Sequence, residues 1–119
     1  MCIVVVDDEP DLRQIVTHVL EDEGYRVLSF AHPVPVTRLW ETDERPNLFL
    51  IDIMLPEMSG ITLAARLKDG GFEAIPKIAM SASPRMIQVA KESQLFDATL
   101  DKPFEVDDLL DCIERFARA

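Results

Sequence analysis

Leu48–Gly60 reads LFLIDIMLPEMSG, and its first five residues decide the fold class. Four consecutive apolar residues, Leu48–Ile51, run directly into the carboxylate of Asp52. An unbroken apolar run of this kind is typical of a strand that is buried on both faces of a parallel sheet. Cys2–Val6 (CIVVV) follows the same pattern and ends at two adjacent acidic residues. Both segments are therefore predicted to be central strands of one parallel sheet.

Apolar runs alternate with amphipathic stretches along the rest of the chain. Further strands are predicted at Tyr25–Phe30, Ile75–Met80 and Ala98–Leu100. Apolar residues at helical spacing, or prolines that can open a helix, mark five helices. These helices are centred on the segments 12–20, 33–40, 61–67, 86–92 and 106–113. The alternation predicts an α/β fold with a five-stranded parallel sheet, five flanking helices and right-handed crossovers.

Length and charge narrow the possible functions. A chain of 119 residues has the usual size of one domain, so residues 1–119 are expected to form a single domain. Its 12 basic and 22 acidic side chains give a net charge of −10, which disfavours nucleic acid and membranes as direct partners. No apolar run reaches about 18 residues and the N-terminus lacks a basic signal segment, so a cytoplasmic location is expected. Cys2 and Cys112 form no CxxC or Cys/His cluster, which argues against a zinc site.

Polar residues with related chemistry follow the predicted strands. Asp7 and Asp8 follow the first strand, Asp52 the third, Ser81 the fourth, and Lys102 lies just after the fifth. Sites in open parallel sheets form at the carboxyl ends of the strands. If the first and third strands are neighbours, three carboxylates converge there and repel one another unless a cation is present. Oxygen ligands without histidine or cysteine favour Mg²⁺ or Mn²⁺, and the hydroxyl and ammonium groups would suit a bound phosphoryl group.

Each of these residues also has a simpler interpretation. Asp8 or Ser81 alone could cap a helix, and Lys102 alone could be a surface lysine. The acidic run within residues 7–11 could be a solvated loop. A coincidence of all of them at strand ends is unexpected, however. Two acids that directly follow a buried strand also incur a desolvation cost, which favours a metal role.

Four short motifs, spread over essentially the whole chain, contain these acidic residues, the serine and the lysine. They are Val6-Asp7-Asp8-Glu9-Pro10, the Asp-x-x-x-Pro-x-Met-x-Gly string of 52–60, Met80-Ser81-Ala82, and Lys102-Pro103-Phe104. In this order and spacing they resemble a response regulator receiver domain of the CheY-like superfamily. The resemblance implies a flavodoxin-like, doubly wound sheet with strand order 2-1-3-4-5 and a cis Lys102-Pro103 bond.

The resemblance also implies how the chain is used in a two-component phosphorelay. Asp52 would accept a phosphoryl group from a phosphohistidine on a sensor histidine kinase or a histidine phosphotransfer protein. Lys102 would pair with a phosphoryl oxygen, while Ser81 would donate a hydrogen bond to it and draw the following loop inward. The modified state would alter contacts with a downstream protein target or an output domain. The protein would be a switch rather than a metabolic enzyme.

The metal site follows from the same resemblance. Asp7, Asp8 and Asp52 would hold Mg²⁺ together with the backbone carbonyl of Met54.

No output domain follows Ala119 in this sequence. The chain is therefore expected to be either a stand-alone regulator or a piece of a larger regulator or hybrid kinase. The resemblance implies that the kinase docks on the first helix, here the Asp11–His18 region, and on the loop after the fifth strand, here Pro103–Phe104. The helical spacing of Ile15 would equally fit a core position.

Two segments depart from the family pattern. Thr99 lies where relatives often have Tyr or Phe as a rotamer switch, three residues before the lysine. Because threonine has no ring to swing, phosphorylation is expected to move the loop after Ser81 without an aromatic relay. Gln94–Asp97 replaces the frequent Gly-Ala-Asp before the fifth strand, which indicates a different exit from the fourth helix. Leu95 and Phe96 are expected to pack rather than to form an exposed patch.

Other functions fit only parts of the sequence. An aspartyl-phosphate phosphatase or transferase usually has a second acid two residues after the nucleophile, where this chain has Met54. A phosphorylation-independent interaction module would not need the complete set of acids, hydroxyl and lysine. A nucleotide-binding protein of similar architecture would need a glycine-rich loop after the first strand, where Asp7-Asp8-Glu9 lies. A phosphoryl-accepting receiver domain is therefore preferred.

Overall fold

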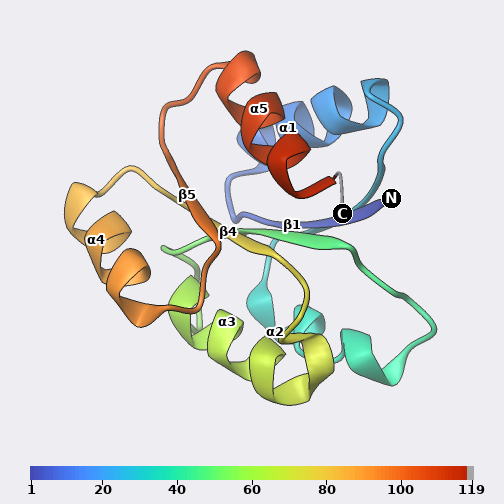
Figure 1. Ribbon diagram of the computed structural model, residues 1–119, viewed down its shortest axis with the longest axis vertical. Coiled ribbons are helices and arrows are strands. Elements are labelled where there is room, and N and C mark those ends of the chain that lie inside the picture. The colour runs from blue at the N-terminus through green and yellow to red at the C-terminus, as the bar shows by residue number, and fades with distance from the viewer. Residues whose placement is uncertain (118–119) are drawn as a thin grey trace.

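The computed structural model describes residues 1–117 and shows a parallel sheet between two layers of helices (Figure 1). The strands are β1 (Cys2–Val6), β2 (Arg26–Phe30), β3 (Leu48–Asp52), β4 (Lys77–Ser81) and β5 (Ala98–Asp101). All neighbouring strands are parallel, and their order is β2-β1-β3-β4-β5. The predicted fold class and strand order are confirmed.

The helices divide between the two faces of the sheet. They are α1 (Pro10–Asp22), α2 (Pro33–Val36), α3 (Gly60–Leu67), α4 (Pro84–Ser93) and α5 (Val106–Ala117). In Figure 1, α1 and α5 lie together above the sheet, with α2 and α3 below it. The apolar clusters place α4 on the same face as α3. None of the helices within residues 1–117 is long and apolar enough to cross a bilayer.

Alternate residues of β1 point to opposite faces, because successive side chains of a strand alternate. Ile3 and Val5 pack with α1 and α5 in one apolar cluster. Val4 and Val6 pack with α2 and α3 in a second cluster on the other face. Every residue of β1 is buried, as in β3 and β4. This two-sided burial is the reason for the unbroken apolar runs in the sequence.

Several boundaries differ from the sequence prediction. β4 begins at Lys77 rather than Ile75, because Pro76 has no N–H to donate to a neighbouring strand. The segment 33–40 forms only the single turn of α2 and a separate 3₁₀ turn at Leu39–Glu41. α3 ends at Leu67 and continues as one wide turn, Lys68–Phe72, in which Gly71 has a φ of 105°.

The exit from α4 agrees with the expected departure from the family. Gln94 ends the helix with a φ of 61°, the left-handed conformation that glycine commonly supplies at this position. Phe96 then packs against both clusters on the α3 face, and Leu95 is half-buried. The packing expected for Phe96 is confirmed, whereas Leu95 joins none of the apolar clusters of the described residues. Ile15 is 56% exposed, so its helical spacing does not place it in the core.

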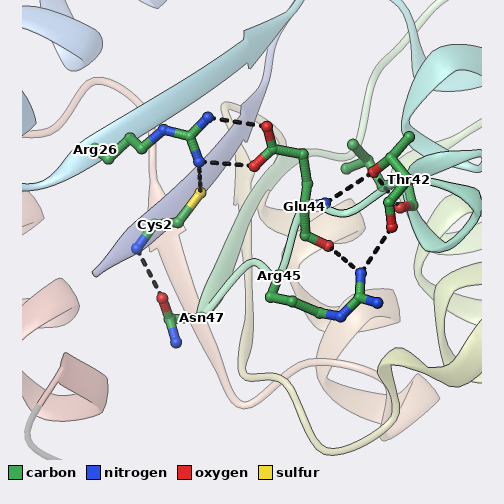
Figure 2. A network of polar contacts seen from close by, with 7 residues as sticks. Cys2, Arg26, Thr42, Glu44, Arg45 and Asn47 are labelled. Carbon is green, nitrogen blue, oxygen red and sulfur yellow. Dashed lines mark hydrogen bonds and ion pairs between the residues drawn. The ribbon is translucent and has the colours of Figure 1, made fainter.

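A polar network ties β1 and β2 to the loop that precedes β3 (Figure 2). The N–H of Cys2 donates to Asn47 Oδ1 at 2.7 Å, and the N–H of Asn47 donates back to the Cys2 carbonyl at 2.8 Å. Arg26 makes a two-pronged ion pair with Glu44 at 2.7 and 2.9 Å, and this contact lowers the pKa of the Glu44 carboxyl. The network lies at the amino ends of the strands, opposite the predicted site.

The Asn47 contact gives a first testable prediction. Asn47→Ala leaves the Cys2 N–H without its acceptor, and we expect a loss of about 1 kcal/mol in the free energy of unfolding. Asn47→Asp keeps an oxygen at this position and is the matched control. Urea unfolding of the three proteins measures the difference. Equal midpoints for Asn47→Ala and the parent would mean that the paired contact adds nothing to stability.

Candidate functional site

Two buried carboxylates meet where β1 and β3 end. The last register pair of these strands is Val6 with Ile51, so the next residues, Asp7 and Asp52, lie side by side. Asp7 is 1% exposed and Asp52 3%. Asp8 is exposed, yet it offers a carboxylate oxygen such that oxygens of all three acids lie within 4.8 Å of one another. The predicted convergence of the three acids is confirmed.

Lys102 reaches this cluster from the segment after β5. Its Nζ donates to Asp7 Oδ2 at 2.9 Å and to Asp52 Oδ2 at 3.0 Å. The same ammonium lies 3.6 Å from a carboxylate oxygen of Glu9. The Lys102 side chain is only 9% exposed, so it is an internal counter-ion and not a surface lysine. The Lys102-Pro103 bond that follows is cis, as expected.

Asp7 is held through each of its polar groups. Its N–H donates to the Phe30 carbonyl at 3.1 Å, and its Oδ1 accepts from the N–H of Glu9 at 2.9 Å. Its carbonyl accepts from Arg13 Nη1 at 2.8 Å. With the Lys102 contact, Asp7 is bound to four different residues. These four contacts fix the position of the loop after β1 around Asp7.

Asp52 is held less completely. Oδ1 accepts from the N–H of Met54 at 3.1 Å, and Oδ2 accepts from Lys102. Met54 is 61% exposed, and its contact with Asp52 is made by its backbone N–H. Burial raises the pKa of the Asp52 carboxyl, since the contact with Lys102 only partly offsets the desolvation and nearby Asp7 adds to it.

The pKa of Lys102 is raised from its usual value. Burial acts to lower this pKa, but the hydrogen bonds to Asp7 and Asp52 outweigh the desolvation. The ammonium is therefore charged at neutral pH. The three clustered carboxylates of Asp7, Asp8 and Asp52 together with the Lys102 ammonium carry a formal charge of 1 − 3 = −2, to which nearby Glu9 adds further negative charge. Oxygen ligands and a deficit of two charges fit a divalent cation such as Mg²⁺.

Ser81 lies at the same end of the sheet, with a different set of contacts. It is the last residue of β4 and is 1% exposed. Its Oγ accepts from the N–H of Ser83 at 3.0 Å, and its carbonyl accepts from the N–H of Lys102 at 2.9 Å. The hydroxyl thus caps the loop that leads into α4. Of the predicted residues, Ser81 is the one whose side chain is engaged outside the acid cluster.

Gly60 contributes to the site through its lack of a side chain. A Cβ at this position would lie 2.8 Å from the Cα of Ile53 and closer still to the carbonyl oxygen of Asp52. The N–H of Gly60 donates to the Ile53 carbonyl at 2.8 Å, so the backbones are in direct contact. Gly60 therefore lets α3 begin directly against the end of β3 that carries Asp52.

Comparison with known proteins identifies the family. Residues 3–114 match the response regulator receiver domain. The chain is a receiver domain. It is 30% identical over 115 residues to sporulation initiation phosphotransferase F of Bacillus subtilis, a match that covers 96% of this chain and 91% of the relative. Receiver domains are phosphoacceptor switches of two-component signalling.

Solved receiver structures have the same fold. A CheY-like receiver domain protein from Methanospirillum hungatei is 31% identical, with a TM-score of 0.84 over 96% of this chain and 90% of that one. The response regulator TrrA of Thermotoga maritima, in complex with Mg²⁺ and BeF, is 23% identical, with a TM-score of 0.84 over 97% of both chains. The second likeness concerns the fold alone.

Sequence reasoning about this receiver domain missed two residues near the acids. The sequence indicates only an acidic motif at Glu9, but the Glu9 carboxylate lies 3.6 Å from the Lys102 ammonium. No motif gives Arg13 an individual role, yet its guanidinium donates to the carbonyl of Asp7. The available signal for Arg13 is its position on the first turn of a helix that starts beside four acidic residues. A lone basic residue there is a candidate for contact with the preceding loop.

Proposed function

We propose that Asp52 is the phosphoacceptor of this receiver domain and that Lys102 orients it. The supporting observation is the position of Lys102 Nζ, 2.9 Å from Asp7 and 3.0 Å from Asp52. The donor is a phosphohistidine on a sensor histidine kinase or on a histidine phosphotransfer protein. The exposed Ile15 on α1 is available for contact with such a partner.

Mg²⁺ is held by the carboxylates of Asp7, Asp8 and Asp52, together with the backbone carbonyl of Met54. The supporting observation is the cluster of oxygens within 4.8 Å and its unbalanced charge. The same oxygen donors would accept Mn²⁺. When bound, the ion offsets the negative charge that accumulates on a phosphoryl group during transfer.

The residues of the chain then act as follows. Lys102 favours the ionised form of Asp52, which is the nucleophilic form of a carboxyl group whose pKa is raised by burial. The N–H of Met54 holds Oδ1, which leaves Oδ2 and its ammonium partner to meet the incoming phosphoryl group. Attack of a carboxylate oxygen on phosphorus forms an acyl phosphate and releases the histidine nitrogen.

Ser81 transmits the change. Its hydroxyl accepts from the N–H of Ser83 in the unmodified protein, and a phosphoryl group on Asp52 would accept a hydrogen bond that the hydroxyl donates. Rotation of the hydroxyl toward the phosphoryl group moves the loop that starts α4. Thr99 is half-buried on β5 and has no ring, so the loop movement itself is the signal.

The domain is a switch and not a metabolic enzyme, acting in the cytoplasm. It spans residues 1–119 as a single receiver domain, and its phosphorylated form binds a downstream protein target or an output domain. A net charge of −10 supports a protein partner over direct contact with nucleic acid or membrane.

Phosphorylation with a small donor tests this proposal. The protein is incubated with Mg²⁺ and acetyl phosphate, and its intact mass is measured. We expect a gain of one phosphate that is lost in Asp52→Asn and in EDTA. Asp101→Asn, which alters an exposed acid at the end of β5, is the matched control and should still be modified. No mass gain in the parent, or a gain that persists in Asp52→Asn, would refute the assignment.

A further inference from the structure

We infer that Arg13 is a positioning residue for the cation site, because it holds the peptide group that joins Asp7 to Asp8. This inference rests on the proposed binding of Mg²⁺ by these acids. Arg13 lies in the first turns of α1 and is half-buried. Its Nη1 donates to the Asp7 carbonyl at 2.8 Å, across the loop that carries the acids.

The choice of acceptor is informative. Four acids, Asp7, Asp8, Glu9 and Asp11, lie within six residues of Arg13 in the sequence. Nevertheless, within residues 1–117 the guanidinium forms no ion pair with a carboxylate, and its side-chain hydrogen bond goes to a backbone oxygen. A charged donor to a carbonyl makes a strong, directional contact. The contact therefore specifies backbone geometry and does not neutralise a side chain.

The geometry that it specifies is that of Asp8. The Asp7 carbonyl and the Asp8 N–H belong to one planar peptide unit, so fixing the carbonyl fixes the plane that contains the Asp8 Cα, the atom from which the side chain leaves the backbone. Asp7 itself has other anchors, since its carboxylate contacts Lys102 and Glu9 N–H. The Asp8 side chain is exposed and, within the described residues, forms no hydrogen bond of its own.

Two effects of Arg13 on cation binding have opposite signs. As a nearby positive charge, Arg13 repels a cation, so its removal would by itself strengthen Mg²⁺ binding. As an anchor of the Asp7–Asp8 peptide, Arg13 assembles the oxygens, so its removal would weaken binding. Residues that orient metal ligands typically change affinity by about 10–100-fold when mutated. We expect the positioning effect to dominate.

Arg13→Met provides the test, with Mg²⁺ affinity measured directly by isothermal titration calorimetry on metal-free protein. We expect the dissociation constant to rise at least about tenfold. Arg13→Lys should stay within about threefold of the parent, because a single N–H makes the contact and a lysine can supply one. Arg45→Met is the matched control: Arg45 also donates to carbonyls, those of Thr42 and Glu44, at the far end of the sheet (Figure 2).

Each outcome decides the matter. Unchanged or tighter Mg²⁺ binding by Arg13→Met would overturn the inference, as would an equal loss in Arg13→Lys or in Arg45→Met. Thermal unfolding checks that each variant is folded. Arg13→Gln, which is polar but too short for the contact, replaces Arg13→Met if that variant does not unfold cooperatively. A parent protein that binds no Mg²⁺ would instead refute the proposed function, whatever the variants do.

Discussion

Gly60→Ala is expected to destabilise the protein by about 3 kcal/mol or more, the upper range for overpacking a closely packed position. The added methyl group would overlap the carbonyl oxygen of Asp52 and lie 2.8 Å from the Cα of Ile53. Both are backbone atoms of a buried segment, and the hydrogen bond between Gly60 N–H and the Ile53 carbonyl prevents an easy shift. Any relaxation must move α3 away from the end of β3.

Gly70→Ala is the matched control, since a methyl group there would also come within 2.6 Å of another atom. That atom belongs to the ring of Trp40, which is 38% exposed and can turn aside. We expect a cost of no more than about 1 kcal/mol for Gly70→Ala. Urea unfolding measures both variants. If Gly60→Ala lost no more stability than Gly70→Ala, the close backbone contact would not be the reason for glycine at position 60.

Lys102→Met is expected to destabilise the metal-free protein by about 3 kcal/mol at neutral pH. Removal of the ammonium leaves Asp7 and Asp52, at 1% and 3% exposure, without a counter-ion. Mg²⁺ should recover most of this loss, because it binds the folded state and replaces the missing positive charge. The measurement is denaturant unfolding in EDTA and in Mg²⁺. An unfolding curve that matched the parent in EDTA would contradict the buried-pair explanation.

The pH dependence of Lys102→Met has a definite sign. Burial already raises the pKa of Asp52, and Lys102 opposes this rise, so the variant raises it further. A carboxyl with a higher pKa in the folded state than in the unfolded state binds protons preferentially when folded. The deficit in stability is therefore full above the folded pKa and shrinks as the pH falls through it.

Lys77→Met separates this effect from the general cost of losing a buried lysine. Lys77 is 3% exposed, and its ammonium donates to the carbonyls of Phe72 and Ile75. It lies at the start of β4, away from the acids, and burial lowers its pKa. We expect Lys77→Met to destabilise the protein equally in EDTA and in Mg²⁺. Only for Lys102→Met should the loss of stability relative to the parent become smaller when Mg²⁺ is present.

The central sheet could be predicted from the sequence because a strand that is buried on both faces has apolar side chains at successive positions. Ile3–Val6 and Leu48–Ile51 are continuously apolar, and the acids that end them mark the carboxyl edge. The helical spacing of apolar residues was a less reliable guide to which residues are buried. Ile15 has the spacing of a core residue, yet it is 56% exposed.

Within the site, charged and polar side chains could be predicted, whereas backbone contacts could not. Asp7, Asp8, Asp52 and Lys102 are recognisable because their chemistry is visible in the sequence. Arg13 acts on a carbonyl oxygen that every residue possesses, so no pattern of side chains identifies its target.

The distance in sequence between the interacting groups has a consequence for biosynthesis. Lys102 is 95 residues from Asp7 and 50 from Asp52. During translation, the ribosome releases all three acids long before it releases β5 and the lysine. A nascent chain that has formed only β1 to β4 holds the acids without their ammonium. Asp7 and Asp52 therefore acquire their counter-ion only late in assembly, once β5 and the segment after it have been made.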